Sequence, residues 1–167
     1  MLFNSYSFLF VFFPLLLIFW RLAASSGSAH LGLVLLLFST VFYALWGLPF
    51  LCLLAAVLGM NYAFALALAA PERTEAEAGA APAGRKCLLA TALTLNVLPL
   101  LWFKYSAFLV QNLAALFSVQ WQFDPPGLPL GISFYTFIQI AWLVSVYRGQ
   151  VTPQGFSRHA LFSACFP

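Results

Sequence analysis

The sequence predicts an all-α, polytopic transmembrane protein with about five spanning helices and one further helix that is interfacial or half-inserted. Its 167 residues are 63% hydrophobic and only 7% charged, whereas a soluble domain is about half apolar and about a quarter charged. The mean hydropathy is +0.97, and uncharged runs reach the ~20 residues that an α-helix needs to cross a bilayer. Seven Lys and Arg residues are too few for the clustered basic surface of a nucleic-acid-binding protein.

The first three predicted spans cover residues 2–20, 30–46 and 50–70. The first lacks the positive start of a signal peptide and exceeds its usual ~7–15 apolar residues, so we expect a retained helix. Small residues suited to cleavage do follow it, in "LAASSGSA". Residues 31–71 hold 41 positions without a charge, which is enough for two crossings. The "WGLP" stretch at Trp46–Pro49 supplies the Gly and Pro of a turn between them.

The second half begins with a polar loop at residues 71–86, which holds six of the 11 charged side chains (7 basic plus 4 acidic). A fourth span is predicted at residues 87–103 and is ended by Lys104. Apolar side chains at helical spacing then predict an interfacial helix at about 105–118. After a Pro-Pro break, the fifth span is predicted at residues 128–147.

The placement of basic residues predicts the orientation of these spans. With the N-terminus outside and five crossings, six basic residues lie on the cytoplasmic side, as the positive-inside rule favours. The polar loop at residues 71–86 is then cytoplasmic. The six residues are Arg21, Arg73, Arg85, Lys86, Arg148 and Arg158, and Lys104 alone lies outside. If the segment after Lys104 crosses fully, Arg148 changes side.

The last predicted span carries the polar groups that best suit a binding site. Hydroxyl and amide side chains gather on one half of this helix at ~100° per residue, whereas apolar side chains such as Phe134 and Phe137 fill the other half. Polar groups at membrane depth are costly unless they are paired, and they face the interior of the bundle. Ser and Thr can also bond to their own helix, and Tyr can anchor at the interface, so a purely structural role is the alternative. The candidates are Ser133, Tyr135, Thr136 and Gln139.

No set of residues in the sequence forms a complete catalytic or metal site. His30 and His159 have no carboxylate or Cys beside them in the sequence, so we expect a solvated or structural role for each. Three cysteines without pair spacing indicate neither a disulfide framework nor a zinc site. We therefore predict no metal site and no bound cofactor.

Several motifs, in order, resemble the membrane-bound O-acyltransferase family, and the resemblance covers essentially the whole chain. It is most similar to the bacterial branch that contains alginate O-acetyltransferase and the D-alanyl transfer protein of teichoic acids. The chain departs from the family pattern where Ser145 replaces a common Asp and Trp142 a frequent Tyr. The matching stretches are "MLFNSYSFLFVFFPLLLIFW", "LNVLPLLWFKYSAF", "LPLGISFYTFIQIAWLVSVYRG" and "ALFSACFP".

The resemblance implies that residues 1–167 are the N-terminal part of one membrane domain. The family's catalytic histidine lies in a later helix, beyond Pro167, and maps onto neither histidine of this chain. The resemblance therefore assigns no catalytic residue here and leaves open whether this chain alone is an enzyme. It makes the polar face at Ser133, Tyr135, Thr136 and Gln139 a candidate lining of a substrate tunnel.

The implied reaction is transfer of an acyl group, with acetyl expected, to hydroxyls of an exported polysaccharide such as alginate. The donor would be acetyl-coenzyme A or an acyl-carrier thioester. The implied partners are the lipid bilayer, the C-terminal half of the fold and periplasmic acetylation proteins. The implied location is the bacterial inner membrane. The alternatives are D-alanyl transfer to teichoic-type polymers and a non-catalytic membrane scaffold or assembly protein.

Overall fold

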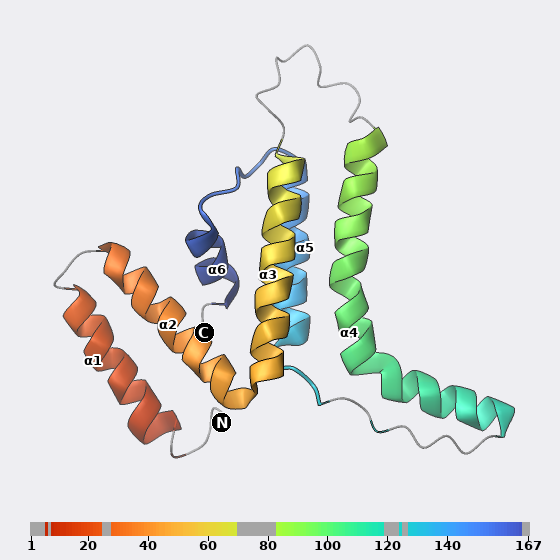
Figure 1. The fold of residues 1–167 in the computed structure, drawn as a ribbon, viewed down its shortest axis with the longest axis horizontal. Helices are drawn as coiled ribbons and strands as arrows, with labels where there is room; N and C mark the ends of the chain where they lie inside the picture. The colour runs from red at the N-terminus through yellow and green to blue at the C-terminus, as the bar shows by residue number, and fades with distance from the viewer. Residues whose placement is uncertain are drawn as a thin grey trace, which may run out of the picture. The chain divides into compact units, whose positions relative to one another are not determined.

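The computed structural model describes residues 6, 8–24, 28–69, 83–118, 124 and 127–164, without the side chains of 28–30 and 83. Most of the polar loop predicted at 71–86 lies outside the described residues. Every regular element among the described residues is helical (Figure 1), which confirms the predicted all-α class. The elements are η1 (Phe8–Phe12), α1 (Phe13–Ala24), α2 (Ser28–Trp46), α3 (Leu48–Leu68), α4 (Ala83–Phe117), α5 (Ile132–Tyr147) and α6 (Phe156–Ala164).

Among the described residues, helical segments overlap each of the five predicted spans. Two of them, Leu48–Leu68 and Gly84–Phe117, are long and apolar enough to cross a membrane. Shorter apolar helices occupy Phe8–Ala24, Leu31–Trp46 and Ile132–Tyr147. The number of crossings and their orientation stay predictions.

The chain forms two compact units, and the division falls inside α3. Unit 1 comprises Met1–Tyr62 and Pro153–Pro167, and unit 2 comprises Ala63–Thr152.

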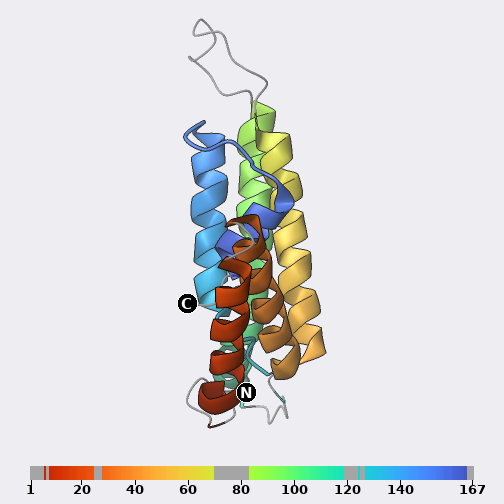
Figure 2. The same cartoon turned by 90° about the vertical axis from the view of Figure 1, so that its left-hand side faces the viewer.

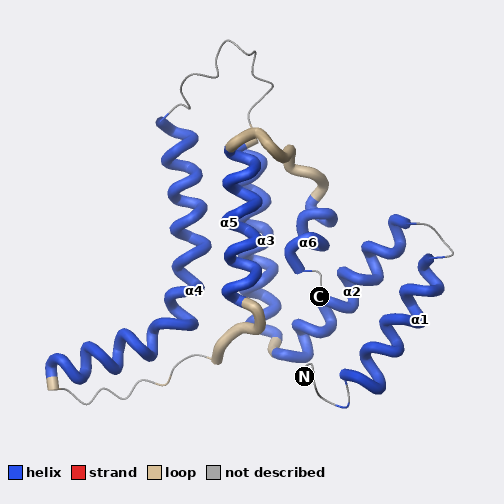
Figure 3. The backbone as a smooth tube through the Cα atoms, turned by 180° about the vertical axis from the view of Figure 1, so that it is seen from behind, coloured by secondary structure: helices blue, strands red, loops and turns tan. Residues whose placement is uncertain are grey.

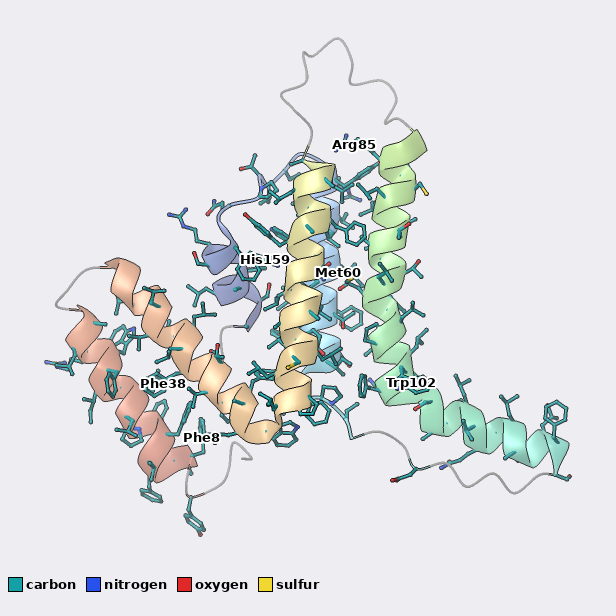
Figure 4. All side chains as sticks on the ribbon, viewed as in Figure 1. Phe8, Phe38, Met60, Arg85, Trp102 and His159 are labelled. Atoms are coloured by element: carbon teal, nitrogen blue, oxygen red, sulfur yellow. The ribbon has the colours of Figure 1, made fainter. Side chains whose placement is uncertain are left out.

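Aromatic packing holds the first helices of unit 1 together. The rings of Phe8 and Phe12 pack against that of Phe42 in α2, with centroids 5.7 and 5.6 Å apart, and Phe12 also meets Phe38 at 5.4 Å (Figure 4). The wide π-helical turn of η1 ends at Phe12, two residues before Pro14. Proline has no backbone N–H and breaks the regular bonding of a helix, and single π turns often accommodate such irregularities.

The predicted turn between the second and third spans is present at Gly47. Its N–H donates to the Tyr43 carbonyl at 3.2 Å, and its own carbonyl accepts from Leu51 at 3.2 Å. One helix thus ends and the next begins at the same residue. Pro49 lies in the first turn of α3, where its missing N–H leaves no helical bond unmade.

Helix α6 packs against α2 in unit 1. The approach is close at Gly32, because a Cβ added there would lie 3.2 Å from Leu161. His159 of α6 is buried, and its ring lies 5.9 Å from that of Tyr62 in α3 (Figure 4). A cavity of about 190 Å³ lies between α2, α3 and α6 and is lined mainly by apolar side chains.

Unit 2 is built on α4 and α5 with the end of α3. The α4 helix joins the predicted span at 87–103 and the predicted helix at about 105–118 into one element, with Pro99 inside it. The helix bends sharply in its second half (Figure 3), as expected beyond a proline that removes an internal hydrogen bond. Which part crosses a membrane and which lies along its surface stays a prediction.

The core of unit 2 joins all three helices. Its buried members are Ala65 and Leu68 of α3, Ala92 of α4, and Leu143 and Val146 of α5. Small alanines let the helix backbones approach closely, as is common between membrane helices. Figure 2 shows α4 and α5 running alongside each other.

Candidate functional site

The candidate helix α5 begins after Gly131, whose backbone conformation favours glycine. Gly131 caps the helix with φ 67° and ψ 16°, in the left-handed region, which costs other L-residues roughly 1–2 kcal/mol. Its carbonyl accepts the N–H of Tyr135 at 3.0 Å, which closes the first turn. The "PLG" sequence before the helix therefore determines where the polar face starts.

The polar face of α5 turns inward. Tyr135, Thr136 and Gln139 are buried, with exposed fractions of 3%, 1% and 0%. On the opposite face, Phe134 and Phe137 are 60% and 64% exposed. The periodicity therefore placed three of the four candidates correctly in the interior, whereas Ser133 is only half-buried. That these residues bind substrate stays a prediction.

Sequence reasoning missed two buried polar residues of the same unit, Asn96 and Ser106 of α4. Asn96 of α4 is 2% exposed, and its Nδ2 donates to the Ala92 carbonyl of its own helix at 2.8 Å. A lone Asn within the apolar "ALTLNVLPLL" run was the available signal, because an amide at membrane depth needs partners.

A basic side chain joins three helix ends in unit 2. The guanidinium of Arg85 donates to the carbonyls of Leu68 at 2.8 Å and Tyr147 at 3.4 Å, and lies 5.3 Å from the centroid of the Tyr147 ring (Figure 4). Those carbonyls end α3 and α5, where helix dipoles concentrate negative charge. The same bonds show that α4 starts where α3 and α5 end, so it runs antiparallel to both.

Ser145, which replaces a common Asp of the family pattern, bonds within its own helix. The Ser145 hydroxyl donates to the Ala141 carbonyl of its own helix at 2.9 Å. Arg148 follows at the end of α5 as an exposed cap residue whose N–H donates to the Val144 carbonyl at 3.0 Å, and the N–H of Gly149 donates to the Val146 carbonyl at 3.0 Å. With Ser at position 145, the end of α5 is stabilised by the cation of Arg85 and not by an ion pair to Arg148.

Neither histidine belongs to unit 2, which contains α5. His30 lies in α2, but its side chain is outside the described residues. His159 belongs to unit 1, and burial lowers its pKa to about 4, so it is neutral near pH 7. Among the described residues, no group of three or more His, Cys, Asp and Glu side chains could hold a metal ion.

The chemistry available on α5 is that of hydrogen bonding. Hydroxyls and amides in a dry interior can orient a carbonyl or hydroxyl group with strength that water would otherwise reduce. A general base or nucleophile is not among the buried groups of this face. The features described so far define a helical membrane protein with an internal polar face.

Comparison with known proteins identifies the relatives of this chain. It is 39% identical over its whole length to a probable alginate O-acetylase AlgI of Pseudomonas putida, of which it covers 33%. It is 40% identical to a protein of the same name from Pseudomonas aeruginosa, of which it covers 31%. The chain is 33% identical, over 89% of its length, to a peptidoglycan O-acetyltransferase of Helicobacter pylori, and the match covers 27% of that protein.

These relatives confirm the resemblance to the membrane-bound O-acyltransferase family. The chain spans about a third of the length of the curated relatives that it matches. No family model matches the sequence, and no solved structure matches it.

Proposed function

We propose that this chain is part of a membrane O-acetyltransferase that adds acetyl groups to hydroxyls of an exported polysaccharide, with alginate as the acceptor. The observation that carries the proposal is the 39–40% identity along the entire chain to proteins named alginate O-acetylases. The buried hydroxyls and amide of α5 support it, because acyl transfer between a thioester and an alcohol needs groups that hold a carbonyl and a hydroxyl together.

In this proposal Thr136 and Gln139 orient the reactants along the inner face of α5, with Tyr135 beside them. Both side chains are almost completely buried, and each can donate a hydrogen bond to an oxygen. The proton acceptor for the sugar hydroxyl is supplied by polypeptide other than the residues assigned here. The donor is acetyl-coenzyme A or an acyl-carrier thioester.

The proposed setting is the bacterial inner membrane, with several crossings and the N-terminus outside. Acyl thioesters are cytoplasmic and exported polymers are not, so the protein must bring the two together across the bilayer. Periplasmic acetylation proteins are the proposed partners on the acceptor side.

Peptidoglycan is the second candidate acceptor. One specific observation favours it, namely the 33% identity to a peptidoglycan O-acetyltransferase over 150 residues. Both polymers present sugar hydroxyls, so the same chemistry on α5 would serve either acceptor.

A chimera tests the proposal. The matching residues of the Pseudomonas aeruginosa alginate O-acetylase are replaced by this chain, and the chimera is expressed in cells that lack their own alginate O-acetylase. We expect acetyl esters on the exported alginate. A chimera that inserts normally but leaves alginate without acetyl groups would contradict alginate as the acceptor, and acetyl esters appearing on peptidoglycan would select the second candidate.

A further inference from the structure

We propose that Asn96 of α4 and Gln139 of α5 form an amide pair across the helix interface, and that this pair positions the polar face of α5. The pairing is independent of the proposed function, whereas the positioning role rests on it.

The register of α4 and α5 places the two amides opposite each other. Ala92 and Leu143 belong to one buried cluster and are both 0% exposed. Asn96 lies four residues after Ala92, and Gln139 lies four residues before Leu143, so each is about one turn away on the same face of its helix. Because the Arg85 bonds make the helices antiparallel, both steps lead in the same direction along the bundle.

Burial supports the same pairing. Asn96 is 2% exposed and Gln139 is 0% exposed, and both lie in unit 2. A carboxamide that leaves water without hydrogen bonds is costly, and amide hydrogen bonds between helices stabilise their packing in membranes. Two buried amides at one level of adjacent helices meet this need in the simplest way.

The intrahelical bond of Asn96 indicates which amide donates and which accepts in the pair. Its Nδ2 donates to the Ala92 carbonyl at 2.8 Å, which holds the carboxamide plane against its own helix. The carboxamide oxygen is then the acceptor that it can offer to a neighbour, and Gln139 can donate through Nε2. The flexible Gln139 side chain is thereby held in one rotamer, one helical turn from Thr136.

Cross-linking tests the pairing without reference to activity. In the full chain, with the native cysteines changed to alanine, Asn96→Cys is combined with Gln139→Cys and treated in membranes with a short bifunctional thiol reagent. Ala92→Cys with Leu143→Cys is the positive control. Leu95→Cys with Gln139→Cys is the matched negative control, because Leu95 is one residue round the helix and 36% exposed.

We expect the 96–139 pair to cross-link as efficiently as the 92–143 pair and at least about tenfold more than the 95–139 pair. Equal or greater cross-linking at 95–139 would overturn the pairing. Failure of the 92–143 pair would also overturn it, because the register would then be wrong.

An amide exchange tests the positioning role in the chimera described above. Asn96→Leu should lower kcat for acetyl transfer about tenfold with little change in KM, because orientation of bound substrate is lost. Asn96→Gln combined with Gln139→Asn keeps the summed length of the two amides and should restore most of the activity. The positioning role would be overturned if the pair cross-links but the double variant is no more active than Asn96→Gln or Gln139→Asn alone. The pair would then be a structural contact. A chimera that is inactive before any substitution would contradict the proposed function and leave the cross-linking test intact.

Discussion

Arg85, in the first turn of α4, donates a hydrogen bond of 2.8 Å to the carbonyl of Leu68 at the end of α3. The two residues are separated by the polar segment between α3 and α4, and the same guanidinium reaches Tyr147 at the end of α5. One side chain therefore satisfies carbonyls at two helix ends, which have no partners within their own helices. A planar guanidinium with five donors suits this role better than an ammonium does.

Replacing Arg85 should destabilise unit 2. Hydrogen bonds from a charged group and its interaction with helix dipoles are worth about 1–2 kcal/mol together at a half-buried position. We expect Arg85→Ala to lower the free energy of unfolding by this amount and Arg85→Lys to recover only part of it. Thermal unfolding of the purified protein in detergent measures the change. Lys86→Ala, at the exposed neighbouring position, should have little effect, and an equal loss in both variants would argue against the helix-end role.

Removing the polar groups of α5 should impair transfer without impairing insertion. Thr136→Val keeps the shape of the side chain and deletes its hydroxyl, and Gln139→Leu deletes the amide. Loss of one orienting hydrogen bond of about 1.4 kcal/mol corresponds to about a tenfold slower reaction. Acetyl content of the polymer made by the chimera measures the effect. Ser145→Ala is the matched control, because the Ser145 hydroxyl donates to the Ala141 carbonyl of its own helix. Wild-type transfer in the Thr136 and Gln139 variants would reject the assigned role.

The position of Gly131 should tolerate no other residue without cost. Gly131→Ala forces an alanine into φ 67°, which costs about 1–2 kcal/mol. Gly59→Ala should act in the opposite direction, because an added Cβ there meets no atom within 4 Å and alanine favours the helix by about 0.8–1 kcal/mol. Unfolding of the two variants side by side gives the comparison. Equal effects of the same sign would show that the left-handed backbone at Gly131 is not what limits this position.

Acidification should weaken the fold through His159. Burial lowers the pKa of His159 from 6.5 to about 4, so below pH 6.5 the unfolded chain binds a proton that the folded chain excludes. Stability is therefore lost as the pH falls from about 6.5 to 4, with no further loss from this group below that. His159→Phe retains a ring beside Tyr62 and should flatten this part of the stability profile. A profile of unchanged slope in His159→Phe would assign the pH dependence to other groups.

Most helices of this fold could be predicted from composition and spacing, because the signals for each helix lie within its own segment. The helix α6 (Phe156–Ala164) was not predicted. Long uncharged runs determine the helices, the "WGLP" stretch determines the turn at Gly47, and the polar periodicity of α5 determines which side faces inward. The predicted span at 87–103 and the predicted helix at about 105–118 form one continuous helix, α4, in the structure. A single proline bends a helix without ending it when tertiary packing supports the rest.

What the sequence determined by itself is the all-helical membrane class, the helical segments and the inward face bearing Thr136 and Gln139, since these depend on hydrophobicity and on the 3.6-residue period of one helix at a time. What only the tertiary structure decided is which groups meet. The bonds of Arg85 to the ends of α3 and α5, the shared buried cluster of Ala92 and Leu143, and the ring contact of His159 with Tyr62 all join residues far apart in the chain. No local pattern encodes such contacts, because they depend on the register in which the helices pack.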